Sequence, residues 1–401
     1  MRAYSPLLRL PGALGFCAAA LVGRMPLSML GIGSVLLVQD RRGSYALAGL
    51  VAAAYALGQA VVAPVVSRLV DRRGQSAVLP WALVTCAAAL VAVVLTAGSD
   101  LPGWTIVASA AVGGAALPPL GACVRARWTS ALRSAGREDL LGTAFALESV
   151  LDEVVFVTGP ALVVALAVGV DPAAGLLVAV GLTTLGTVAF VAQRGTEPPV
   201  VPVPEAGAAA ALAVPGLRTV AATMVFVGLL FGSLELAVVA FADEQGSPGA
   251  AGVLLSVFAL GSGTSGLLYG ARTWRWPLER RLLLALAALL ASAVPVVLAP
   301  GLGVLGVAAF VAGLSISPTL IASFGLVERL VPVEARTEGF TWLNSGLSLG
   351  ASAGAVSAGA LVDGPGARAA LALSLVGAGL ALATAAARRR SLVPAQVDPV
   401  G

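Results

Sequence analysis

Five charged residues interrupt long apolar stretches of the chain: Arg24, Glu148, Asp152, Glu153 and Glu235. Glu153 is turned roughly 140° from Glu148 on a helix and can point elsewhere. A charge in hydrocarbon is costly, so each of these side chains is expected to face a cavity or an opposite charge. Glu148 and Asp152 are four residues apart, which places both carboxyl groups on one face of a helix. Two buried carboxylates one turn apart resist double ionisation, so one of them can hold a proton. The chemistry that suits these residues is proton binding and release.

Arg24 and Asp152 are expected at similar depths in a membrane. Arg24 lies about 13 residues into the first apolar stretch and Asp152 about 12 residues into the fifth, which is about 20 Å and about 18 Å along a helix. Both positions fall just past the middle of a hydrocarbon core about 30 Å thick. We predict that Glu148 and Asp152 carry a coupled proton and that Arg24 senses it as their partner. The alternative is a structural ion pair that never releases a proton.

Glu235 lies about 18 residues into the seventh apolar stretch, which places it nearer the outer mouth of the protein. There it is either a functional acid or an ordinary residue of the membrane interface. The sequence alone favours the interface.

The residue types that are missing exclude much of catalysis. The chain has no His and no Lys, so all 24 basic residues are Arg. Imidazole metal ligands, His general bases, Lys Schiff bases and the lysine-containing phosphate loop of a primary pump are therefore excluded. Cys17, Cys86 and Cys123 are isolated in apolar stretches and are expected to be small core residues. We expect no enzyme activity, no metal site and no cofactor.

The elements that position these residues are membrane spans. Of 401 residues, 58% are hydrophobic and 11% are charged, whereas roughly 25% of residues are charged in a soluble domain. Because a spanning helix takes about 20 apolar residues, the length suits about 12 spans. Hydropathy predicts all-α spans at about 11–38, 45–66, 77–97, 104–124, 140–168, 174–193, 217–240, 250–270, 282–299, 302–327, 340–362 and 368–387.

The distribution of Arg predicts the topology. With a cytoplasmic N-terminus, 20 of the 24 Arg residues fall in inner segments and only Arg41, Arg42 and Arg368 fall outside. The positive-inside rule therefore puts both termini in the cytoplasm of a plasma membrane protein. The Arg residues are scattered and form no patch with aromatic residues, so no nucleic-acid partner is expected. The first apolar stretch is too long for a signal peptide and is expected to stay uncleaved.

The chain repeats itself. Residues 48–58 recur as residues 251–261, and Leu147-Glu148-Ser149 matches Leu343-Asn344-Ser345 in the eleventh span. We predict two pseudo-symmetric six-helix bundles, at residues 1–194 and 217–387, followed by a cytoplasmic tail at 388–401. The proline-rich residues 195–216 are expected to form a cytoplasmic linker. Two such halves are typical of transporters that alternate access around a site at the bilayer midplane.

The turn between the second and third spans carries a family signature. Residues 67–76 resemble the Gly-x-x-x-Asp-Arg/Lys-x-Gly-Arg/Lys-Arg/Lys loop of the major facilitator superfamily. Asp71, Arg72 and Gly74 take its Asp, basic and Gly positions, while Ser67 replaces its first Gly. Gln75 and Ser76 replace its final basic pair. The resemblance implies that this loop holds the cytoplasmic side closed. The alternative is a plain solvated basic loop.

A second resemblance lies in the fifth span. Gly159-Pro160 matches the core of the antiporter motif of the same superfamily, although Val163 and Val164 stand where a Gly pair is expected. Pro160 is expected to kink the helix. The resemblance implies a drug-exporter-like transporter in the lipid bilayer, which we expect to be a monomer. The use of Arg alone as the basic residue, with abundant Ala and Gly, indicates a bacterial source. Because the membrane core offers few fixed polar groups for a sugar or a polyanion, we expect export of a hydrophobic or amphipathic small molecule in exchange for protons. An uptake permease and a non-transporting sensor or assembly factor are the alternatives.

The Arg asymmetry generates a topology prediction. A reporter fused after Arg194 and a second reporter fused to the C-terminal tail should both give a cytoplasmic signal, because most Arg lies on that side. Alkaline phosphatase and green fluorescent protein fusions measure this in opposite compartments. An external signal from either position would contradict the duplicated six-span arrangement.

Overall fold

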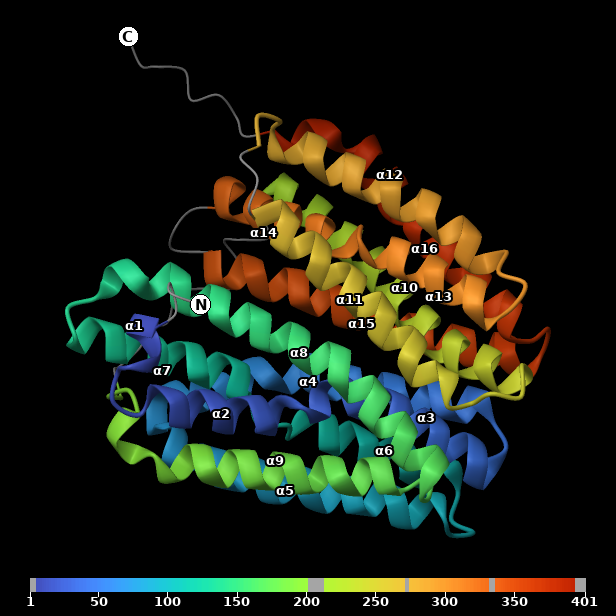
Figure 1. The fold of residues 1–401 in the computed structure, drawn as a ribbon, viewed down its shortest axis with the longest axis horizontal. Coiled ribbons are helices and arrows are strands. Elements are labelled where there is room, and N and C mark those ends of the chain that lie inside the picture. Colours follow the sequence, from blue (N-terminus) through green and yellow to red (C-terminus); the bar gives the residue numbers. More distant parts are fainter. Residues whose placement is uncertain (1–4, 201–212, 271–273, 332–335, 394–401) are drawn as a thin grey trace. The chain divides into compact units, whose positions relative to one another are not determined.

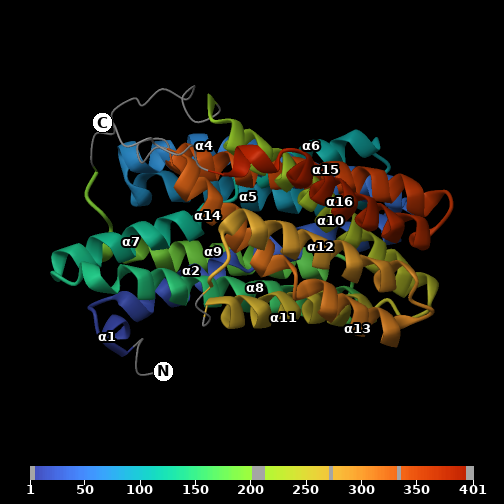
Figure 2. The same cartoon turned by 90° about the horizontal axis from the view of Figure 1, so that it is seen from above.

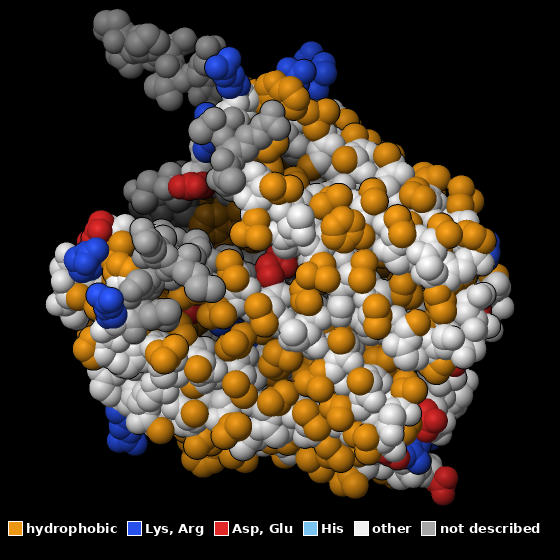
Figure 3. Space-filling view, viewed as in Figure 1, with side chains coloured by type: hydrophobic (Ala, Val, Ile, Leu, Met, Phe, Trp, Pro, Cys, Tyr) orange, Lys and Arg blue, Asp and Glu red, His pale blue; other side chains and the backbone are white. Residues whose placement is uncertain are grey.

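The structure is helical and suited to a membrane. The computed structural model describes residues 5–200, 213–270, 274–331 and 336–393. These residues contain no β-strand, and among them are twelve helical spans long and apolar enough to cross a bilayer (Figure 1). Trp81 and Val61 are 76% and 70% exposed, and Figure 3 shows a face made mainly of hydrophobic and uncharged side chains. The predicted all-α fold with 12 spans is confirmed.

The chain divides into two compact units, residues 1–204 with 242–256 and residues 205–241 with 257–401. Much of the predicted linker, residues 201–212, lies outside the described residues. The first nine helices are α1 (Ser5–Leu8), α2 (Ala13–Arg24), α3 (Pro26–Arg42), α4 (Tyr45–Arg73), α5 (Gln75–Ala97), α6 (Gly103–Ala115), α7 (Leu120–Ser134), α8 (Leu141–Gly169) and α9 (Ala174–Ala192). The others are α10 (Pro215–Glu244), α11 (Ala250–Gly270), α12 (Leu278–Val297), α13 (Leu302–Gly313), α14 (Ile316–Leu330), α15 (Arg336–Asp363) and α16 (Ala367–Ala387).

Two spans of the first unit are broken helices. The first span consists of α2 and α3, which meet at Met25 and Pro26. Proline suits the first position of α3 because its missing N–H would have no intrahelical partner there. The fourth span consists of α6 and α7, and residues 116–119 between them include two prolines. By contrast, α8 continues through Pro160 as one helix from Leu141 to Gly169.

Two helices run further than the hydropathy pattern predicts. The fourth span was expected to end near residue 124, but α7 continues to Ser134 and includes Arg125 and Arg127. Both of these residues had been assigned to an inner loop. The second span is predicted at 45–66 and found at Tyr45–Ser67, but the helix that carries it, α4, continues to Arg73. Hydropathy ends a span at its first charges, whereas these helices continue because the charges at these ends have partners or reach solvent.

Glycines bring the backbones of paired helices into contact, and the repeat preserves this packing. In the first unit, α4 packs on α6, and a Cβ on Gly58 or Gly114 would meet the backbone of the facing helix. In the second unit, Gly261 of α11 and Gly313 of α13 have the same relation. The repeated sequence at 48–58 and 251–261 thus encodes one helix-pair interface twice, as small residues do in membrane helices.

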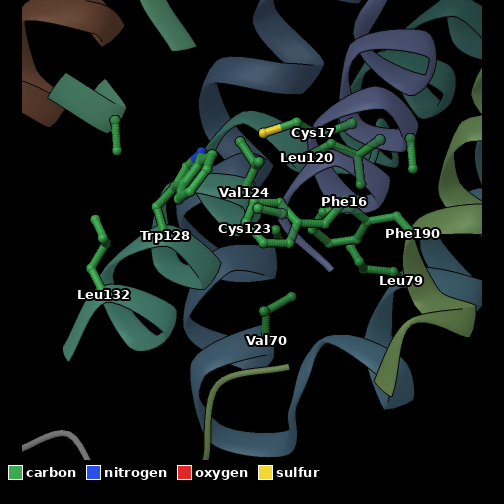
Figure 4. Packing of buried hydrophobic residues seen from close by; sticks show 14 of the residues in the cluster. Phe16, Cys17, Val70, Leu79, Leu120, Cys123, Val124, Trp128, Leu132 and Phe190 are labelled. Atoms are coloured by element: carbon green, nitrogen blue, oxygen red, sulfur yellow. The ribbon is translucent and has the colours of Figure 1, made fainter. Parts of the chain in front are cut away.

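A cluster of buried apolar side chains lies in the first unit where α2 packs against α7 and α9. Figure 2 shows these three helices together. Figure 4 shows Phe16, Leu120, Val124, Trp128 and Phe190 in this cluster. The rings of Phe16 and Trp128 meet edge to face, with centroids 4.9 Å apart. This packing fixes the indole of Trp128, whose N–H is thereby aimed at the charged residues of α8.

The glycine contacts generate a stability prediction. Gly114→Val should lower the melting temperature of the purified protein, because overpacking of this kind costs about 1–3 kcal/mol. Gly181→Val is the matched control, because no side-chain or facing backbone atom lies within 4 Å of a Cβ at that position. Equal melting temperatures for the two variants would show that α4 and α6 separate without cost.

Candidate functional site

Arg24 lies at the end of α2 and is 2% exposed. Its guanidinium bridges both acids of α8: Nη2 lies 2.7 Å from Oε2 of Glu148, and Nη1 lies 2.8 Å from Oδ1 of Asp152. Nε donates to the carbonyl of Ala20 at 3.1 Å. The structure therefore brings together the three residues that the sequence singled out for proton coupling.

Glu148 is fully buried and has three donors. Besides Arg24, the indole N–H of Trp128 donates to its Oε1 at 2.9 Å, and the thiol of Cys17 donates to the same oxygen at 3.3 Å. A buried carboxylate is stable only when its charge is paired and its lone pairs accept hydrogen bonds. Glu148 meets both conditions, so it can remain an anion inside the unit.

Asp152 has a different setting one turn further along α8. Its side chain is 33% exposed, and its two oxygens bind two different arginines. Oδ1 binds Arg24, and Oδ2 lies 2.8 Å from Nη2 of Arg125, a side chain that is 37% exposed. Nη1 of Arg125 also donates to the carbonyl of Gly121 at 3.0 Å. The four charges alternate as Glu148, Arg24, Asp152 and Arg125, and they sum to zero.

Sequence reasoning missed three members of this network: Arg125, Trp128 and Cys17. Arg125 was treated as a loop residue and Cys17 as a small core residue, although its thiol is also a donor. The sequence does carry a signal for Arg125 and Trp128, because the apolar spacing of a helix continues past the first arginines of this segment. The buried residues of α7 follow that spacing: Leu120, Cys123, Val124, Arg127, Trp128 and Leu132.

The antiporter-like pair lies two turns beyond Asp152 on α8. The hydroxyl of Ser28 in α3 donates to the carbonyl of Val155 at 2.8 Å. A Cβ on Gly159 would collide with that hydroxyl. Gly159 therefore permits α3 and α8 to approach closely.

The proposed gate is a tight turn and not a loop. Of the signature, only Gly74 lies between α4 and α5, and its φ of 88° is in the region that favours glycine. Ser67 is half-buried and Arg72 is exposed, while the side chain of Asp71 lies outside the described part of the structure.

This turn is fastened within the first unit by Arg127, which is fully buried. Its Nε donates to Oε1 of Gln75 at 2.8 Å, and its Nη1 donates to the carbonyl of Gln193 at 3.0 Å. The guanidinium also stacks on the ring of Phe190, 3.8 Å from its centroid. Oε1 of Glu197 accepts the backbone N–H of Ser76 at 2.8 Å. The start of the linker is thus tied to the turn that carries the signature.

Glu235 belongs to the second unit, in α10. Asn344 and Ser348 of α15 stand where Glu148 and Asp152 stand in the first unit. Among the described residues, no group of three or more Cys, Asp or Glu side chains is close enough to hold a metal ion.

Comparison with known proteins gives the family. The sequence model of the Major Facilitator Superfamily matches residues 13–242 and 220–399. The chain belongs to this superfamily of transporters and is a multi-pass membrane protein.

Solved structures share the fold at low sequence identity. A mutant of the nucleoside transporter NupG has a TM-score of 0.71 at 14% identity, covering 94% of this chain and 99% of its own. The human organic anion transporter MFSD10 (TETRAN) has a TM-score of 0.65 at 16% identity, covering 96% and 100%. A bacterial homologue of the iron transporter ferroportin has a TM-score of 0.64 at 14% identity, covering 93% of this chain and 98% of its own. No curated protein matches the sequence.

The network generates a prediction on stability. Glu148→Gln should destabilise the protein by about 3–5 kcal/mol, because it removes one partner of a buried ion pair and leaves Arg24 undercompensated. Asp152→Asn should cost less, because Arg24 keeps Glu148 and Arg125 is already partly in solvent. Thermal melting in detergent measures both.

The matched control is Glu138→Gln, which removes an exposed pair with Arg133 at 3.2 Å and should leave the melting temperature unchanged. If Asp152→Asn were as destabilising as Glu148→Gln, the two acids would share one structural role.

Proposed function

We propose that this protein exports a hydrophobic or amphipathic small molecule across the plasma membrane in exchange for protons, by alternating access of two six-helix bundles. Its domains are those expected from the repeat, residues 1–194 and 217–387, joined by the linker 195–216. The protein acts as a monomer with both termini in the cytoplasm. The observation that carries the proposal is the position of Asp152, a partly exposed acid held between two arginines inside a spanning helix.

Of the two acids on α8, Asp152 is the better proton carrier. A proton on Glu148 would remove the main countercharge of Arg24 and would disturb the donors Trp128 and Cys17. A proton on Asp152 releases Arg125, which is partly exposed and can be hydrated, while Arg24 keeps Glu148. Glu148 therefore holds Arg24 in place, and Asp152 exchanges the proton. Arg24 senses the change because it is bonded to both.

The substrate follows from what the spans lack. Apart from the charged cluster, the spans of the first unit offer few fixed polar groups for a sugar or a polyanion, which favours a lipophilic substrate. The partial antiporter motif at Gly159 supports export. The structural neighbours move nucleosides, organic anions and iron by their names, so they share a fold without narrowing the substrate. Residues 67–74 act as the cytoplasmic gate, with Asp71 and Arg72 as the charged residues that match the family signature.

The test is transport with and without an imposed proton gradient. Deleting the gene should increase sensitivity to a toxic lipophilic compound, and that compound is then the substrate for reconstituted vesicles. Asp152→Asn should exchange the compound by counterflow but fail to concentrate it, because the gradient can no longer be used. Glu138→Gln should transport as the wild type does.

Two results would contradict this proposal, one for the proton carrier and one for the direction of transport. Uphill transport by Asp152→Asn with the wild-type pH dependence would place the proton carrier elsewhere. Loss of a growth substrate on deletion, in place of sensitivity, would reverse the direction to uptake.

A further inference from the structure

Glu235 lies deep in an apolar part of α10. This helix runs from Pro215 to Glu244, so Glu235 is about 13 Å from its last residue at 1.5 Å per residue. Glu235 is half-buried, and the seven residues after it, 236–242, are apolar and buried. The first exposed residue beyond it is Asp243. An interfacial acid has polar, exposed neighbours within a turn, whereas almost two turns of buried helix separate Glu235 from such neighbours.

Glu235 also has no countercharge. Within the described residues, it takes part in no ion pair and no hydrogen bond. It differs in this respect from Glu148 and Asp152, whose carboxylates bind arginines at 2.7–2.8 Å. A protein accommodates an acid in low dielectric either by pairing it or by neutralising it. Glu148 and Asp152 of α8 are paired with arginines. Glu235 has no such pair, which leaves neutralisation by a proton.

The charged and titratable groups of the neighbouring helices are occupied elsewhere. Helix α10 packs on α15 through Gly232, on α16 through Gly377, and on α11 through the Phe231 and Phe258 rings. On these helices the described groups of this kind are Tyr269, Asp363 and Arg368.

Arg368 is the one cation among the described side chains of these three helices. It donates to the carbonyl of Ala299 and lies over the ring of Phe241, six residues or about 9 Å along the helix from Glu235. Tyr269 accepts from Arg281 at 2.9 Å, and Asp363 is the last residue of α15. On α10 itself, Arg218 is in the first turn, and Asp243 and Glu244 form its polar end. None of them pairs with Glu235.

We propose that Glu235 is a proton-binding site in the second unit. Its carboxylate takes up one proton from water to become a neutral carboxyl group, and it returns that proton to water when α10 becomes hydrated. One isolated carboxylate without further acidic ligands does not make a divalent metal site. The first unit keeps its acids on α8, whereas the second has Asn344 and Ser348 at those positions and its acid on α10.

The experiment is labelling of the whole protein in membranes with dicyclohexylcarbodiimide, an apolar reagent that reacts with protonated carboxyl groups. The carboxyl proton moves to a carbodiimide nitrogen, the carboxylate oxygen adds to the central carbon, and the adduct rearranges to a stable N-acylurea. Peptide mass spectrometry then reports each acid separately. We expect labelling of Glu235, decreasing at least about tenfold between about pH 6 and about pH 9. Glu148 should be labelled more slowly than Glu235, because Arg24, Trp128 and Cys17 occupy its carboxylate oxygens.

Two variants control the result. Glu235→Gln, which mimics the neutral carboxyl group, should remove the label and leave the melting temperature unchanged. Glu244→Gln removes an exposed acid from the same helix and should leave the label in place. Labelling of Glu235 no faster than that of Glu244, or independent of pH, would overturn the proposal. Labelling reports Glu235 directly, so this outcome is independent of whether Asp152 couples transport.

Discussion

The permanent charge of Arg24 is the constraint around which the first unit is organised. A guanidinium cannot be neutralised in a protein, so an arginine in the middle of a membrane span must be surrounded by acceptors. Those acceptors come from α2 itself and from both acids of α8, and the acids in turn bring in donors from α7 and α2. Three helices are thereby held at one depth by one side chain. The apolar cluster around Phe16 and Trp128 packs against this network and orients one of its donors.

The two units solve the same packing problem with opposite chemistry. In the first, α8 meets its neighbours through charges, with Arg24 between Glu148 and Asp152. In the second, α15 meets α10 through glycines such as Gly350 and Gly354, which lie directly on the facing backbone. The repeat therefore preserves the helices while it changes what lies between them. This difference gives a duplicated protein two chemically distinct halves.

Much of the fold could be predicted from the sequence because hydropathy measures the one property that a bilayer demands. Twelve spans follow from hydropathy, and the similar depths predicted for Arg24 and Asp152 in the membrane were enough to indicate that the two residues are partners. The ends of the spans were harder to predict, because a hydropathy pattern treats Arg125 and Arg127 as exposed charges. Whether an arginine ends a helix depends on partners such as Asp152 and Gln75 that lie far away in sequence. Trp128 and Cys17 were missed for a related reason, because their apolar character concealed one hydrogen-bond donor each.

The glycine contacts between α4 and α6, and between α11 and α13, have a mechanical consequence. Two helices whose backbones touch behave as one two-stranded beam, and the bending stiffness of a beam rises steeply with its thickness. Such a pair transmits a push along its length with little flexing. Deformation is then concentrated where the hydrogen-bonded ladder is already interrupted, at Met25–Pro26 and at residues 116–119. The mechanical units of this fold are therefore fewer and stiffer than its number of helices suggests.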